Sequence, residues 1–322
     1  LGQGRYRIDG VPRMRLRPIA PLLGALTALG ADAQSEMGTG CPPIVVNASG
    51  LPGGAAEMAG DLSSQYFSAL LMAAPYARNG VEVGVIGDLV SKPYLPMTTS
   101  VMAAFGVQAD LDTVNWARLG VQPGQHYTGR HYPIEPDASN ASYFFAAAAV
   151  TGGRVRVEGL GRGSTQGDLG FVEVLRAMGA DVSVGEDATE VQGPPNGDLR
   201  GVDLDLGPIS DTAQTLAAIA PFADGSTTIR GVGHARLKET DRVAALVTEL
   251  RKLGQDVEEF PDGLRITPRP ITPAAIQTYD DHRMAMSFAI AALRAPGIQV
   301  LDPGCVAKTF PRFFDVLDAA TP

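Results

Sequence analysis

Two short charged segments in the last third of the chain hold residue types that could perform acid–base and anion-binding chemistry. One segment is Lys238-Glu239-Thr240-Asp241-Arg242 and the other is Asp280-Asp281-His282-Arg283. A carboxylate can act as a general acid or base, and arginine binds carboxylate or phosphate through parallel hydrogen bonds. Apolar residues at helical spacing follow both segments, so the charged groups are expected at helix starts. The two segments together indicate a site for a small anionic ligand.

The same arrangement recurs along the chain. Polar residues open an Ala-rich helical stretch four times, and 25 to 28 residues later a second polar cluster opens another helix. The first clusters are Ser63-Ser64-Gln65, Asp137-Ala138-Ser139-Asn140, Ser210-Asp211-Thr212 and Asp280-Asp281-His282-Arg283. The second clusters are Ser91-Lys92-Pro93-Tyr94, Ser164-Thr165-Gln166, Lys238-Glu239-Thr240 and Lys308-Thr309-Phe310-Pro311. Short β-like runs lie between the two clusters, so the pattern predicts stacked helix–strand–helix–strands units of roughly 70 residues.

Glycines mark the ends of the second helices. Gly106, Gly179 and Gly254 each follow a helical stretch, and glycine is favoured there because a helix C-terminus commonly needs a positive φ. Leu29-Gly30-Ala31-Asp32 has the same ending. The first residues therefore belong to a fifth, truncated unit, and the chain start has the character of a cut end. The repeat phase breaks near Gln125–Tyr132, where we expect the chain to cross between domains.

Simpler explanations exist for single residues. Asp211 or Asp281 could merely cap a helix, and Lys238 to Arg242 could be a solvated face with one ion pair. Capping does not explain Arg242, Arg283 or Lys308, because a cation at a helix N-terminus opposes the macrodipole. A bound phosphate or carboxylate would remove that conflict.

Composition excludes several classes of function. The 322 residues carry a net charge of −9 with 45% hydrophobic residues, which is typical of a globular protein and not of one that binds nucleic acid. Two cysteines cannot form a disulfide framework, and four histidines without metal-ligand spacing do not predict a zinc site. Apolar runs are too short to cross a bilayer. Cys305 could be a reactive thiol, but a small buried residue is the simpler interpretation.

Taken together, the ordered motifs resemble the EPSP synthase family of enolpyruvyl transferases over the whole chain. The resemblance is carried by Pro12-Arg13-Met14, Ser63-Ser64-Gln65, Ser91-Lys92-Pro93-Tyr94, Asp137 to Phe144, Lys238-Glu239-Thr240-Asp241-Arg242, Asp280-Asp281-His282-Arg283-Met284-Ala285-Met286 and Ala307-Lys308-Thr309-Phe310-Pro311. It implies an α/β fold of two domains built from βαβαββ units, with four complete units and one partial unit in this chain. The domains would be residues 1–131 and 132–322, with the active site between them.

The resemblance implies transfer of the enolpyruvyl group of phosphoenolpyruvate to the 5-hydroxyl of shikimate 3-phosphate, with no cofactor and no metal. Asp211 would be the catalytic base, and Glu239 would take part in proton transfer at the methylene carbon. Shikimate 3-phosphate would be bound by Ser63, Ser64, Gln65, Ser91, Tyr94 and Lys238. The clamp on phosphoenolpyruvate would be Arg13, Arg242, Arg283 and Lys308, oriented by Asp281 and His282.

Some positions depart from the family. His234 stands where an Asn is common, and Leu16 replaces a usually acidic residue. The family's N-terminal Lys-Ser segment and a glycine-rich loop would precede Leu1, so we expect a missing N-terminal segment that is cleaved, disordered or placed on a separate chain. Glyphosate is a further expected ligand, and the bacterial cytoplasm or the plastid stroma is the expected compartment. The alternatives are a remnant that binds shikimate 3-phosphate without turnover and the sister enzyme acting on UDP-N-acetylglucosamine.

Overall fold

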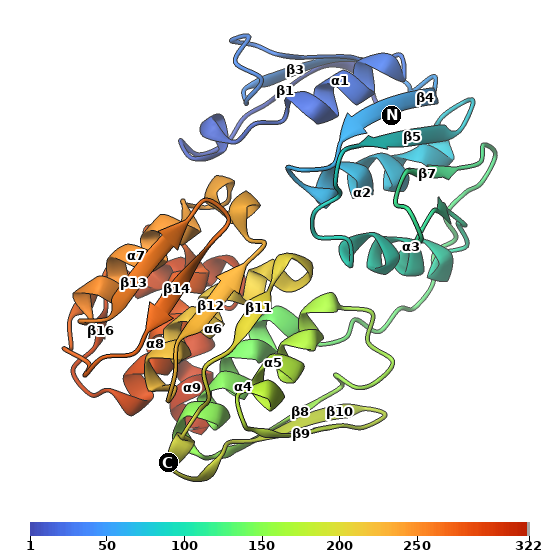
Figure 1. Ribbon diagram of the computed structural model, residues 1–322. Coiled ribbons are helices and arrows are strands. Elements are labelled where there is room, and N and C mark those ends of the chain that lie inside the picture. Colours follow the sequence, from blue (N-terminus) through green and yellow to red (C-terminus); the bar gives the residue numbers. More distant parts are fainter. Residues whose placement is uncertain (321–322) are drawn as a thin grey trace. The chain divides into compact units, whose positions relative to one another are not determined.

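Short sheets alternate with helices throughout the computed structural model, which describes residues 1–320 (Figure 1). The chain divides into two units, Leu1–Pro133 and Ile134–Pro322. The α/β fold of stacked repeats predicted from the sequence is confirmed. None of the helices within the described residues combines the length and the apolar character needed to cross a bilayer.

The first unit contains two sheets, each covered by helices. Its elements are β1 (Gln3–Ile8), α1 (Ala20–Ala28), β2 (Asp32–Ser35), β3 (Ile44–Ser49), β4 (Gly54–Ala59), α2 (Ser64–Ala73), β5 (Val81–Ile86), α3 (Tyr94–Ala104), β6 (Asp110–Leu111) and β7 (Arg118–Val121). The strand orders are β1-β3-β2 and β4-β5-β7-β6. Strands β4 and β5 are parallel, and the other neighbours are antiparallel.

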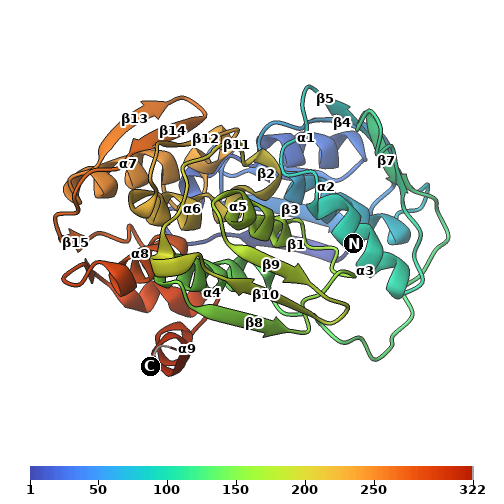
Figure 2. The same cartoon turned by 60° about the horizontal axis from the view of Figure 1, so that its bottom comes forward.

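The second unit repeats this plan. Its elements are α4 (Ala138–Thr151), β8 (Arg154–Glu158), α5 (Phe171–Ala177), β9 (Asp181–Val184), β10 (Ala188–Gln192), β11 (Asp203–Asp205), α6 (Ala213–Ile219), β12 (Thr227–Arg230), α7 (Arg242–Lys252), β13 (Asp256–Phe260), β14 (Gly263–Thr267), β15 (Ala275–Ile276), α8 (His282–Arg294), β16 (Gln299–Val300) and α9 (Phe313–Ala320). Two of the strand orders are β8-β10-β9 and β11-β12-β14-β13 (Figure 2). The third is β15-β16.

Sheet order makes the repeat explicit. The order β5-β7-β6 matches β12-β14-β13, β8-β10-β9 and β1-β3-β2, so β1 to β3 form the second half of a repeat. This confirms the partial unit expected at the chain start. Only the repeats holding β4–β7 and β11–β14 show all four strands among the described residues. Helix α4 instead follows residues 122–137, which form no regular element. Within residues 1–320 the last repeat shows two strands, β15 and β16.

The predicted glycine helix ends are also confirmed. The φ angles are +86° at Gly30, +91° at Gly106, +107° at Gly179 and +81° at Gly254. A residue with a side chain rarely adopts this backbone conformation, so glycine is the residue that ends each helix without strain.

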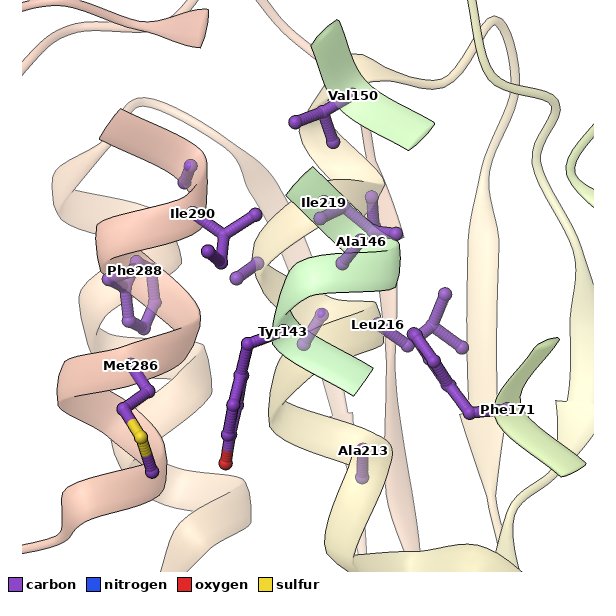
Figure 3. Packing of buried hydrophobic residues seen from close by; sticks show 14 of the residues in the cluster. Tyr143, Ala146, Val150, Phe171, Ala213, Leu216, Ile219, Met286, Phe288 and Ile290 are labelled. Atoms are coloured by element: carbon purple, nitrogen blue, oxygen red, sulfur yellow. The ribbon is translucent and has the colours of Figure 1, made fainter. Parts of the chain in front are cut away.

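Helices α4, α6 and α8 form the centre of the second unit and pack against one another (Figure 3). They are buried almost throughout, and their many alanines have small side chains that let three buried helices approach closely. Figure 3 shows Leu216 and Ile219 of α6 near Ala146 of α4, with Ile290 of α8 facing them. The first unit has its own core around α2, β5 and α3. The three central helices therefore fix where their N-terminal residues lie.

Candidate active site

Three pairs of parallel strands determine where the polar clusters begin. Ala59 pairs with Ile86, Asp205 with Arg230, and Ile276 with Val300, each at the carboxyl end of its strand. The carboxyl ends of parallel neighbours meet at one edge of a sheet, which is where ligands bind in many α/β proteins. In these three repeats the first and the second polar cluster therefore start side by side. The sequence alone could not show this directly.

In the first unit, this arrangement brings together the starts of α2 and α3. Ser63 caps α2 by accepting a hydrogen bond from the Gln65 backbone N–H at 3.3 Å, and Ser64 is buried. Ser91 is buried and has φ +53°, and its carbonyl accepts from the Tyr94 N–H at 3.2 Å where α3 begins. Helix α2 packs on α3. The polar residues predicted at the starts of these two helices therefore belong to the same packed helix pair.

Arg13 lies in the segment between β1 and α1, which corresponds in the repeat to the segment holding Lys238. It is half-buried and precedes the 3-10 turn Met14–Leu16. The Tyr66 hydroxyl on α2 donates to the Pro18 carbonyl at 2.5 Å and so fixes the end of this segment to the helix that Ser63 caps.

In the second unit, Arg242 at the start of α7 is the centre of the charged cluster. Its guanidinium donates to Asp281 Oδ2 at 2.7 Å, to Glu239 Oε2 at 2.8 Å and to Asp211 Oδ1 at 3.0 Å. The residue is only 2% exposed, so the interpretation of this segment as a solvated face is wrong. Three carboxylates from three segments converge on one buried cation, and they hold it in the charged form.

Arg283, the second residue of α8, binds Asp211 from the other side. Its Nη2 donates to Asp211 Oδ2 at 2.8 Å, and its Nη1 donates to the Asp211 carbonyl at 3.2 Å and to the Tyr143 hydroxyl at 3.4 Å. The N-cap of α6 is Thr212, and no side chain caps that helix. Asp211 is thus not a helix cap, whereas Asp281 is both the cap of α8 and a partner of Arg242.

Glu239 lies between two cations. It accepts from Arg242 and from Lys308, which follows β16 in the neighbouring repeat. Burial would raise the pKa of Glu239, but the charges of Arg242 and Lys308 prevail and lower it to about 2. Glu239 is therefore ionised at neutral pH in this structure.

The two histidines of the cluster are neutral at neutral pH. Burial and the charge of Arg283 lower the pKa of His282 to about 4, and its Nδ1 lies 3.7 Å from Asp281 Oδ1. Burial and the charge of Lys238 likewise lower the pKa of His234 to about 4. The Nε2 atom of His234 lies 2.9 Å from the Ser210 hydroxyl, within hydrogen-bonding distance. His234 therefore connects the turn before Lys238 with the turn that holds Asp211.

The sequence did not single out several residues that the structure adds to this cluster. Asp168 is buried, accepts a hydrogen bond from Ser139 and has its pKa raised to about 6, first by burial and then by the charge of Asp211. Tyr143 is fully buried beneath Arg283. Their positions in the sequence gave a weak indication, because Asp168 and Tyr143 each follow a predicted polar cluster by a few residues. Burial raises the pKa of the Cys305 thiol, so an activated cysteine is not supported.

Comparisons with known proteins identify the family of the chain. The family model described as EPSP synthase (3-phosphoshikimate 1-carboxyvinyltransferase) matches residues 1–317. The chain belongs to the EPSP synthase family. A 3-phosphoshikimate 1-carboxyvinyltransferase of Nostoc punctiforme is 53% identical over 322 residues, covering 99% of this chain and 75% of the relative.

More distant members show the same relationship. A chloroplastic 3-phosphoshikimate 1-carboxyvinyltransferase of Petunia hybrida is 49% identical over 325 residues, covering 98% of this chain and 63% of the relative. The solved structure of an EPSP synthase from Acinetobacter baumannii superposes with a TM-score of 0.79 at 25% identity. That match covers 99% of this chain and 74% of the solved chain. Membership of the EPSP synthase family thus rests on sequence and on fold.

Proposed function

We propose that this chain transfers the enolpyruvyl group of phosphoenolpyruvate to the 5-hydroxyl of shikimate 3-phosphate, releasing phosphate. The observation that carries the proposal is the convergence of Asp211, Glu239 and Asp281 on the buried Arg242, in a chain of this family. The names of the relatives favour this transferase over a remnant that only binds shikimate 3-phosphate.

The first step needs a base and a cationic clamp. Asp211 accepts the proton of the 5-hydroxyl while that oxygen bonds to C2 of phosphoenolpyruvate and a proton adds at C3. Arg283 and Arg242 hold the two oxygens of Asp211 at 2.8 and 3.0 Å, which fixes the direction of the carboxylate. Loss of the C3 proton and cleavage of the bond from C2 to the phosphate oxygen then give the product.

Glu239 is the proposed proton carrier at C3, and its contact with Lys308 explains how it could be switched. With its pKa at about 2, it is a poor proton donor. A phosphoenolpyruvate phosphate bound by Lys308 would take this cation from Glu239 and raise the pKa of the carboxyl. Binding of the substrate would thereby prepare the acid that the reaction needs.

The remaining predicted residues would hold the substrates. We assign the hydroxyls and amide of the first unit to shikimate 3-phosphate, together with Lys238, because anions suit helix starts. These residues are Ser63, Ser64, Gln65, Ser91 and Tyr94. Arg13, Arg242, Arg283 and Lys308 would bind phosphoenolpyruvate, and Asp281 and His282 would orient that clamp. Glyphosate would enter as a ligand of the same cations.

We further propose that residues 1–131 and 132–322 are the two enolpyruvyl transferase domains, the last two residues lying outside the described part. The compartment would be the cytoplasm in a bacterium or the stroma in a plastid, in line with bacterial and chloroplastic relatives.

The test is release of inorganic phosphate when the chain is incubated with both substrates. It is run with the chain alone and with the part of the Nostoc punctiforme relative that lies outside the match, added as a separate polypeptide. We expect release that requires both substrates and is lost in Asp211→Asn. Calorimetry provides the opposing outcome. The proposal would be overturned in favour of the binding remnant if shikimate 3-phosphate bound without enhancement by phosphoenolpyruvate or glyphosate and neither mixture showed turnover.

A further inference from the structure

A strained turn directly precedes the Asp281 side chain. The Asp281 N–H donates to the Thr278 carbonyl at 2.9 Å, and the two residues between them, Tyr279 and Asp280, both have φ +56°. Positive φ at both central positions is the pattern of a type I′ turn, which normally contains Gly, Asn or Asp. Tyrosine is a bulky residue for such a position, and strained backbone of this kind persists only where its surroundings hold it.

A buried carboxylate on a neighbouring helix holds this turn. Glu249 on α7 has a fully buried side chain, and its Oε1 accepts from the Tyr279 hydroxyl at 2.6 Å. Its Oε2 accepts from the Gln277 N–H at 3.1 Å, so both sides of Thr278 are tied to α7. Lys252 balances the charge of Glu249 at 2.8 Å. The Glu249 carboxylate is thus paired, hydrogen-bonded and directed at the turn rather than at solvent.

The turn determines where Asp281 lies. Asp281 follows Asp280 directly, is 0% exposed, caps α8 through the Arg283 N–H at 2.9 Å and binds Arg242 Nε at 2.7 Å. A rotation of the turn would displace this carboxylate from Arg242, and with it the contacts of Arg242 to Asp211 and Glu239. Helix α7 therefore contacts the cluster in two ways. Arg242 at its start binds the carboxylates directly, and Glu249 two turns later holds the turn that precedes Asp281.

We propose that Glu249 and Tyr279 are positioning residues of the transfer site: their hydrogen bond holds a strained turn that sets Asp281 against Arg242. This inference rests on the proposed function for its kinetic consequence. Neither residue belongs to the charged cluster itself. The residue Tyr279 is 39% exposed, so a role in packing alone does not account for a tyrosine at this position.

Two substitutions at one position separate the hydrogen bond from the strain. Tyr279→Phe removes the hydroxyl and leaves a bulky residue at positive φ. Tyr279→Asn also removes the hydroxyl but supplies a residue that tolerates this φ. We expect kcat to fall about 10- to 100-fold in Tyr279→Phe, because small displacements of catalytic groups have effects of this size. In Tyr279→Asn we expect most of the activity to return.

Tyr127→Phe is the matched control, since its hydroxyl donates to the Met72 carbonyl at 3.1 Å without a positive φ. We expect wild-type kcat and KM for this variant. Thermal melting of all variants shows whether each is folded at the assay temperature. If kcat falls only where Tyr279→Phe is already unfolding, or if the folded Tyr279→Phe has wild-type kcat, the proposal is overturned.

Amide hydrogen exchange tests the same proposal without turnover. The amides of Asp281 and Arg283 are protected by their bonds to the Thr278 carbonyl and to Asp281 Oδ1. We expect both to exchange faster in Tyr279→Phe and to regain protection in Tyr279→Asn. Unchanged exchange in Tyr279→Phe overturns the positioning role even if the wild type is inactive. An inactive wild type with the expected exchange pattern overturns only the proposed function.

Discussion

Arg242 and Asp281 form an ion pair from which solvent is almost completely excluded: the Nε to Oδ2 distance is 2.7 Å, and the side chains are 3% and 0% exposed. A buried pair of this kind contributes less to stability than its attraction suggests, because both charges lose their hydration. Removal of one member is costly, since the other charge remains buried. The pair therefore gives the clearest stability prediction.

Arg242→Met should lower the free energy of unfolding by about 3–5 kcal/mol, because it leaves the Asp281 carboxylate buried without its cation. Urea unfolding of wild type and variant measures the difference. Arg162→Met is the control: Arg162 pairs with Glu186 at 3.4 Å, but both side chains are mostly exposed. That change should stay within roughly 0.5 kcal/mol. Equal unfolding midpoints for Arg242→Met and wild type would contradict the prediction.

Asp211→Asn should lower turnover by roughly 10²–10⁴, the usual contribution of a general base. The amide keeps an oxygen that can accept from Arg283, so the fold should be retained. Phosphate release gives the rate, and circular dichroism checks the structure. Asp203→Asn, which weakens an exposed pair with Arg230, should leave the rate unchanged. Wild-type turnover in Asp211→Asn would refute the assigned role.

Lys308→Met should raise the pKa of Glu239, because a cation that lowers it is removed. In the folded state the pKa of Glu239 is about 2, against an ordinary value of 4.5. Ionised Glu239 therefore stabilises the folded state above pH 4.5, and this contribution is lost as the pH falls toward 2. The variant should therefore differ from wild type in unfolding free energy mainly above pH 4.5, and the two curves should meet near pH 2. Denaturant unfolding across this range provides the measurement. A constant offset at every pH would show that Lys308 does not act through Glu239.

Asp168→Asn should make the protein more stable at neutral pH. The folded pKa of Asp168, about 6, lies above its ordinary 3.8, so the folded state holds this proton more tightly and stability falls as pH rises from about 3.8 to 6. The full effect is about 3 kcal/mol above pH 6, by the usual conversion of a pKa shift into free energy. An amide oxygen can still accept from Ser139.

The gain in Asp168→Asn should become small by about pH 3, where the wild-type carboxyl is mostly protonated in both states. Thermal or urea unfolding at about pH 3 and pH 7.5 compares the two limits. An equal gain at both values would mean that the variant acts through packing rather than through the charge.

Much of the fold could be predicted because the signals are local and repeated. Gly30, Gly106, Gly179 and Gly254 end helices through their own backbone freedom, so their role is readable without knowledge of any partner. The spacing of the polar clusters likewise predicted a repeat, and the sheet orders confirm it.

The charged cluster was only partly predictable. The argument from cations at helix starts picked out Arg242, Arg283 and Lys308, which the structure places against the same group of carboxylates. It could not show that protein carboxylates surround Arg242, and binding of an anionic substrate by these residues stays a prediction. Glu249 and Tyr279 lie 30 residues apart in sequence, and a tyrosine at positive φ contradicts the local preference from which sequence interpretation starts. Such contacts depend on the packing of α7, which no pattern within either segment reports.

The central packing of α4, α6 and α8 also has a consequence for the order of folding. Each parallel strand pair closes over a short stretch of chain, whereas the bond from Arg283 to Tyr143 joins residues 140 positions apart. Contacts between distant residues form late, because closing a long loop costs entropy before the contact repays it. The strand pairs should therefore form first, and the charged cluster should be completed together with the last helix contacts. Intermediates on the folding pathway would then have their sheets in place and still be unable to bind an anion.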